Sequence, residues 1–119
     1  MRIAVTADGQ SMEAQVDPRF GRAKWFLIYD TDSGQSEVID NAQNLQLAQG
    51  AGIQAAQNIS TTGAQVVLTG HCGPKAFQTL TAAGVQVITG AQGTIEQAIQ
   101  QFQAGALEPA QSPDVEGHW

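Results

Sequence analysis

The side chains best suited to chemistry are gathered in one short turn. This turn holds the only cysteine of the chain, one of its two histidines and a lysine, and it follows a short apolar run. Thiolate and imidazole are ligands for soft and borderline metals, and the lysine adds a positive charge. These residue types together predict a site for something metallic and negatively charged. The turn reads Thr69-Gly70-His71-Cys72-Gly73-Pro74-Lys75.

A second group of candidate residues is basic. The chain has 5 basic and 11 acidic residues, with a formal net charge of -6, which argues against a general nucleic-acid binder. Even so, Arg19, Arg22 and Lys24 stand close together, with Phe20 between the two arginines. In an acidic protein such a local basic cluster is typical of an anion site, although surface charges also cluster by chance.

Strands and helices must position these two groups. Short apolar runs and period-3.6 stripes predict a hairpin followed by alternating strands and helices, and therefore a mixed sheet with helices on its faces. One predicted helix opens with a capping box at Thr94 and Gln97. The predicted strands are 2–7, 24–30, 35–40, 65–69 and 85–88, and the predicted helices are 50–62, 74–83 and one from Thr94 onward.

The loops that carry chemistry should meet at one edge of this sheet. In open α/β sheets, ligands collect at the carboxyl ends of the parallel strands. The loops after Ala7, Thr69 and Ile88 would all open there, and the first of them carries Arg19 and Arg22. We therefore expect the basic residues and the histidine–cysteine turn to face the same crevice. The helix that starts at this turn would also present backbone N–H groups to an anion.

Length and composition predict one compact domain. The chain has 119 residues and is 42% hydrophobic. We expect this domain to span residues 1–105, followed by a flexible, acidic, proline-containing tail over 106–119. No apolar run approaches the ~18 residues of a membrane span, and no segment resembles a signal peptide. A single cysteine cannot form an internal disulfide, which favours the cytoplasm.

The ligand inventory favours a cluster over a single metal ion. A structural zinc site usually needs four protein ligands, and this chain offers one cysteine and two histidines. A cluster that brings its own sulfides needs only one or two ligands and a positive cavity. Two alternatives stay open for Cys72: a nucleophile activated by the helix N-terminus and Lys75, as in a cysteine-dependent enzyme, or an inert buried thiol. Phe20 either caps a pocket or anchors the loop.

Three segments of the chain resemble a known family. They resemble the dinitrogenase iron–molybdenum cofactor biosynthesis family, the small domain of NifX- and NifY-type proteins that also occurs at the end of NifB-type proteins. The resemblance covers about residues 1–105 and implies an RNase-H-like α/β fold without nuclease activity. It implies a mixed five-stranded sheet with an N-terminal hairpin and three flanking helices. The matching segments are residues 1–5, 16–23, with Asp-Pro-Arg-Phe-Gly-Arg as the most specific part, and 70–76.

The resemblance also implies a non-catalytic role. It implies binding, storage or delivery of a preformed anionic molybdenum-containing sulfide cluster, with a possible cluster-donor or acceptor protein and no nucleic acid or membrane partner. The chain looks most like the small orange proteins of sulfate-reducing bacteria, which favours a molybdenum–copper cluster. An iron–molybdenum cofactor precursor is the alternative cargo, and a regulatory docking module is the alternative class. By resemblance the pocket is lined by Arg19, Phe20, Arg22, Gly70, His71, Cys72, Gly73 and Lys75, with Cys72 and His71 as candidate metal ligands.

Overall fold

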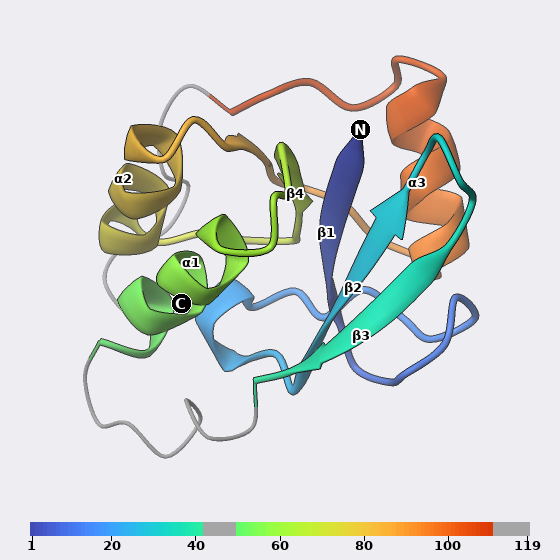
Figure 1. Ribbon diagram of the computed structural model, residues 1–119. Helices are drawn as coiled ribbons and strands as arrows, with labels where there is room; N and C mark the ends of the chain where they lie inside the picture. Colours follow the sequence, from blue (N-terminus) through green and yellow to red (C-terminus); the bar gives the residue numbers. More distant parts are fainter. Residues whose placement is uncertain (42–49, 111–119) are drawn as a thin grey trace.

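Five strands form one mixed sheet with helices on both of its faces (Figure 1). This computed structural model describes residues 1–41 and 50–110. The strands are β1 (Arg2–Ala7), β2 (Trp25–Asp30), β3 (Ser36–Asp40), β4 (Val66–Leu68) and β5 (Gln86–Ile88). The helices are α1 (Ala51–Ser60), α2 (Pro74–Ala82) and α3 (Ile95–Gln103), and η1 (Phe20–Arg22) is a short 3-10 turn.

The strand order confirms the predicted architecture. The sheet runs β3-β2-β1-β4-β5. β2 is antiparallel to β1 and to β3, which gives the expected hairpin. β4 is parallel to both β1 and β5. A helix precedes β4 and another connects β4 to β5, so each of these strands starts from the same edge of the sheet. This is the RNase-H-like mixed sheet with three flanking helices, and the carboxyl ends of β1, β4 and β5 meet at one edge.

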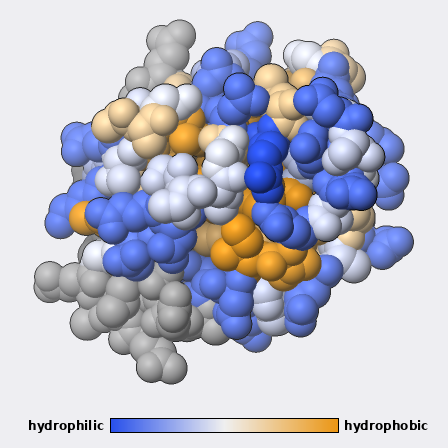
Figure 2. Space-filling view, viewed as in Figure 1, coloured by the Kyte–Doolittle hydropathy of each residue, from blue (hydrophilic) through white to orange (hydrophobic). Residues whose placement is uncertain are grey.

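The core lies in two layers, one on each side of the sheet. α1 and α2 pack on the face that includes Ala4 and Phe26, and α3 packs on the face that includes Val5 and Leu27. Successive strand residues point to opposite faces, so a strand covered on both sides is apolar throughout. This accounts for the unbroken burial of residues 3–7. Figure 2 shows a mostly hydrophilic surface on the side of α1 and α2, with an apolar area over the strands beside α1.

The helix ends agree with the sequence signals, with one exception. The Thr94 hydroxyl and the Gln97 side chain form the predicted capping box at the start of α3. Gly63 and Gly84 follow α1 and α2 with φ of 80°, the left-handed conformation that glycine tolerates. The exception is the end of α2, which was predicted to extend to residue 83 but ends at Ala82, with Ala83 as its exposed cap.

The described part of the predicted tail runs along the sheet edge. The backbone N–H of Ala110 donates a hydrogen bond to the Val87 carbonyl at 2.7 Å. Leu107 is half-buried against the core on the α3 face. The rest of the tail, 111–119, lies outside the described residues, so its flexibility and the domain boundary at 105 stay predictions. Over residues 1–41 and 50–110, no helix has the length and apolar character needed to span a bilayer.

Candidate functional site

Two segments far apart in the sequence are joined at the carboxyl edge of the sheet. We call them the arginine loop (residues 17–22) and the His–Cys turn (residues 69–75). The N–H of His71 donates to the Pro18 carbonyl at 2.7 Å, and the N–H of Phe20 donates to the His71 carbonyl at 3.2 Å. These bonds create a short parallel bridge between Arg19 and His71. The structure thus confirms that the two segments lie together, as the sheet topology predicted.

The crossing of the two segments requires a glycine. A Cβ at Gly70 would lie 2.6 Å from the Pro18 Cα and 2.8 Å from the Pro18 carbonyl oxygen. Both of these atoms belong to the backbone, so neither can rotate away. Gly70 therefore sets how closely the arginine loop approaches the His–Cys turn.

A buried polar cluster fixes the arginine loop to the strand ends. The Thr6 hydroxyl donates to the Asp17 carbonyl at 2.7 Å, and the Asp17 N–H donates to the Thr6 carbonyl at 2.9 Å. The Thr69 hydroxyl lies 3.0 Å from the Thr6 hydroxyl, within hydrogen-bond distance. All three residues are buried, where an unmade hydrogen bond is costly. The loop is therefore held against β1 and β4 together, which preorganises the basic residues.

The polar and charged members of the predicted pocket reach the surface. The Arg19 side chain is 50% exposed, Arg22 and His71 are half-buried, and Lys75 is exposed. Lys75 lies in the first turn of α2, and its side chain makes no hydrogen bond or ion pair within the described part of the chain. Arg19, Arg22 and Lys75 give the edge a local positive charge in an otherwise acidic protein.

Phe20 and Cys72 lie in the core instead. Both have an exposed fraction of 0% and belong to the apolar cluster between the sheet and α1 and α2. The centroid of the Phe20 ring lies 5.6 Å from that of Phe26, and the Cys72 sulfur lies 3.7 Å from the Gly73 carbonyl oxygen. This burial favours anchoring roles: Phe20 holds the arginine loop and Cys72 holds the His–Cys turn. Direct contact of either side chain with a ligand stays a prediction.

The helix that follows the His–Cys turn is open to an anion, whereas α3 is not. At the start of α2, Gly73 supplies no side-chain cap and Pro74 has no N–H. The N–H groups of Lys75 and Ala76 meet no acceptor in the described part of the chain.

The corresponding N–H groups of α3 are occupied. Ile95 donates to the Ala14 carbonyl at 2.9 Å, Glu96 donates to the Met12 carbonyl at 3.0 Å, and Gln97 donates to the Thr94 hydroxyl. The positive end of a helix dipole is therefore available at α2, directly after the His–Cys turn, where the sequence predicted it.

Side chains that bind metals do not gather at this edge in sufficient number for a metal ion. Across residues 1–41 and 50–110, no three side chains of histidine, cysteine, aspartate or glutamate come close enough to hold one. The chemistry that the edge offers is therefore that of cations and amides, which suits an anion that carries its own metal–ligand bonds.

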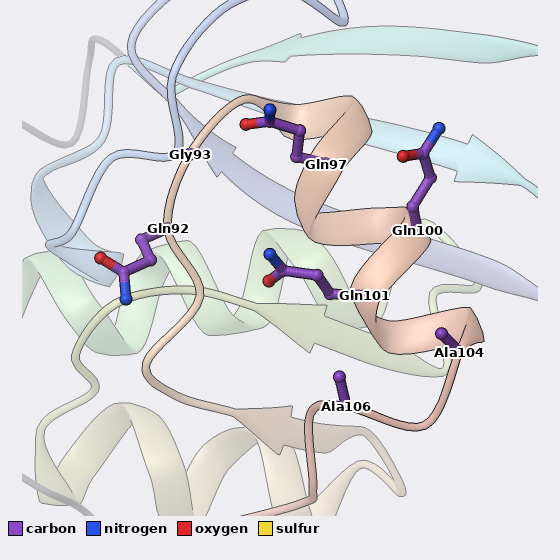
Figure 3. A pocket seen from close by; sticks show the side chains of 7 residues that line it. All are labelled: Gln92, Gly93, Gln97, Gln100, Gln101, Ala104 and Ala106. Carbon is purple, nitrogen blue, oxygen red and sulfur yellow. The ribbon is translucent and has the colours of Figure 1, made fainter.

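An open depression lined by glutamine, alanine and glycine, on the α3 side of the molecule, was not predicted from the sequence. It lies between α3, the loop before it and the segment after it, and has a volume of about 630 Å³ (Figure 3). The depression shows no charged side chain, so it does not suit a polyanion. The glutamine-rich stretch 92–101 was its only sequence signal. Its lining residues are Gln92, Gly93, Gln97, Gln100, Gln101, Ala104 and Ala106.

Known proteins with similar sequence and structure agree with this architecture. A solved structure of the apo form of the orange protein from Desulfovibrio gigas is 46% identical, with a TM-score of 0.94 and 96% of each chain covered. An NMR structure of a candidate NifB protein from Thermotoga is 37% identical, with a TM-score of 0.84 and 98% of each chain covered.

A curated relative and a family model match as well. An uncharacterised protein of Methanocaldococcus jannaschii is 28% identical over 111 residues, which cover 91% of this chain and 90% of that protein. The model of the family described as dinitrogenase iron-molybdenum cofactor matches residues 1–105. The match includes the arginine loop and the His–Cys turn, and the chain therefore belongs to the dinitrogenase iron-molybdenum cofactor family.

Proposed function

We propose that this protein binds a preformed anionic molybdenum-containing sulfide cluster and holds it for storage or delivery, without catalysis of its own. The observation that carries the proposal is the backbone pairing of Arg19 with His71. This pairing sets the backbone of the arginine loop, which carries Arg19 and Arg22, beside the turn that leads into the open start of α2. The proposed binding residues are those predicted from the sequence, with Arg19, Arg22, His71 and Lys75 in contact with the cluster and Gly70, Gly73, Phe20 and Cys72 shaping the site.

The chemistry of this edge matches the cargo. Thiomolybdate-type clusters are polyanions whose sulfides supply most of the metal ligands, so the protein must supply mainly charge and hydrogen-bond donors. Guanidinium groups are weakly hydrated and suit large, soft anions better than ammonium groups do. Amide N–H groups at a helix N-terminus add directional donors. His71 is the half-buried imidazole from which a direct metal bond is proposed.

We favour a molybdenum–copper cluster over an iron–molybdenum cofactor precursor, because that is the cargo implied by the resemblance to the small orange proteins. The orange protein shares more identical residues with this chain than the candidate NifB protein does, at 46% against 37%. The precursor remains the alternative cargo, since the family as a whole is described by the iron–molybdenum cofactor. In either case we propose a cytoplasmic protein that exchanges the cluster with a donor or acceptor protein.

A cysteine-dependent enzyme is less well supported. A nucleophilic thiolate needs access to its substrate, and the Cys72 side chain has an exposed fraction of 0%.

The proposal is tested by reconstitution. Metal-free protein is mixed with tetrathiomolybdate and copper(I), and unbound metal is removed by desalting. We expect visible charge-transfer bands to remain with the protein, with molybdenum and copper in a fixed ratio by metal analysis. Protein that emerges colourless and metal-free would contradict the proposal. Metal analysis of protein purified without added metals then distinguishes the copper-containing cluster from the iron-containing one.

Replacement of Cys72 by alanine separates a ligand role from a packing role. Because the thiol lies in the core, we expect the visible bands of the reconstituted cluster to stay unchanged. The free energy of unfolding should fall by about 1–2 kcal/mol, because a buried side chain is truncated and a small cavity forms. Absorption spectra and urea denaturation of the same samples measure both quantities. A shifted charge-transfer band would instead identify Cys72 as a metal ligand.

A further inference from the structure

One carboxylate lies inside the otherwise positive arginine loop. Asp17 is only 9% exposed. Its Oδ1 accepts a hydrogen bond from the backbone N–H of Arg19 at 2.9 Å and lies 3.9 Å from the Arg19 Nε. Its own N–H and carbonyl are bonded to Thr6. The position of this carboxylate is therefore fixed by the backbone, while the Arg19 guanidinium beside it is half exposed.

We infer that Asp17 is a built-in counter-ion that presets Arg19 and limits how tightly the edge holds its anion. The inference rests on the proposed function and names a positioning residue for it. Asp17 acts through Arg19. The carboxylate lies 3.9 Å from the Arg19 Nε, close enough to orient the guanidinium but too far for a normal hydrogen bond. The N–H donors of the guanidinium therefore stay available to a guest anion. By offsetting part of the positive charge of Arg19, the carboxylate weakens the attraction of that guanidinium for the guest, which favours release.

The buried position of Asp17 makes this charge effective. A carboxylate at the surface is screened by water and salt, whereas the Asp17 side chain, which is 12% exposed, interacts more strongly with its neighbours. The loop thus combines one fixed negative charge with the positive charges of Arg19 and Arg22. Such an arrangement suits a protein that must both bind a cluster and release it to an acceptor, because maximal affinity would prevent transfer.

The test is the isosteric replacement Asp17→Asn. The asparagine Oδ1 can still accept the Arg19 N–H, so the loop keeps its shape while one negative charge is removed. We expect tetrathiomolybdate alone, titrated into the full chain and followed by its visible absorption, to bind about fivefold more tightly than to the wild type. This gain should shrink at high salt. Thermal unfolding confirms that both proteins are folded.

Asp30→Asn is the matched control. The Asp30 carboxylate also accepts a backbone N–H, from Asp32 at 2.8 Å, and the change in net charge is the same, but Asp30 lies opposite Arg2, at the other end of β1 from the arginine loop. We expect no measurable change in affinity for this variant. An equal gain in both variants would show an effect of net charge and overturn the inference, as would an unchanged or weaker affinity of the Asp17→Asn protein.

A double-variant cycle shows whether the effect runs through Arg19. In an Arg19→Gln background, Asp17→Asn should no longer change the affinity, because the pair no longer exists. A full fivefold gain in that background would overturn the positioning role. If the wild type itself takes up no tetrathiomolybdate, the proposed function fails together with the inference. If the wild type binds and Asp17→Asn makes no difference, the inference alone fails.

Discussion

Replacing Arg19 and Arg22 together by glutamine should weaken the binding of a thiomolybdate anion about 30-fold at low salt. Each partly exposed guanidinium that meets an anion contributes about 1 kcal/mol, and two such losses correspond to a factor of about 30 in affinity. Equilibrium titration with tetrathiomolybdate at two ionic strengths measures the effect. The difference between wild type and variant should narrow at high salt, because screening weakens the interactions that the variant lacks.

The matched control for this double variant is Arg2→Gln. Arg2 is the first residue of β1, roughly 15 Å from the carboxyl end of that strand, and its guanidinium pairs with Glu37. The change removes a positive charge while leaving the arginine loop intact, so affinity should stay close to that of the wild type. If Arg2→Gln weakens binding as much per charge as the double variant, the attraction is a property of the whole protein. An unchanged affinity of the double variant would remove both arginines from the site.

A second comparison separates charge from geometry. In Arg19→Lys with Arg22→Lys the charge is retained, but the planar, weakly hydrated guanidinium groups are lost. Binding intermediate between the wild type and the glutamine variant would indicate that hydrogen-bond geometry adds to charge. Binding equal to the wild type would indicate charge alone.

Much of the fold could be predicted because its signals are local. The capping box at Thr94 acts over a few residues, and it lies where the sequence predicted it. The parallel arrangement of β1, β4 and β5 follows from strand–helix alternation. Because parallel strands end at one edge, the proximity of the arginine loop and the His–Cys turn could also be predicted from the sequence.

The roles of individual side chains were harder to predict because burial depends on contacts between distant segments. Phe20 stands between charged residues in a polar stretch, and only the crossing of 17–20 with 70–71 places its ring in the core. Thr6 and Thr69 are ordinary strand residues by type, so their link with Asp17 cannot be read from spacing. Cys72 was a candidate ligand because of its thiol group, whereas its burial depends on packing against α1 and α2.

Gly70→Ala should be the most destabilising of these substitutions. The new Cβ would meet the Pro18 Cα at 2.6 Å and the Pro18 carbonyl oxygen at 2.8 Å, so the arginine loop must move away from the His–Cys turn. Forced overpacking against backbone costs about 3 kcal/mol, which lowers the melting temperature by roughly 10 °C or more in a domain of this size. Urea denaturation and thermal unfolding measure both quantities.

Gly84→Ala is the matched control for that loss. Gly84 has φ of 80°, but no atom lies within 4 Å of the position that a Cβ would take, so its replacement adds backbone strain without a clash and should cost about 1 kcal/mol. Gly84 follows α2, away from the carboxyl edge, so its variant should bind tetrathiomolybdate as the wild type does. Gly70→Ala should bind it more weakly even at temperatures where circular dichroism shows a folded protein, because the hydrogen bonds from His71 and Phe20 can no longer hold Arg19 in place. A folded Gly70→Ala protein with wild-type affinity would show that this crossing does not position the anion site.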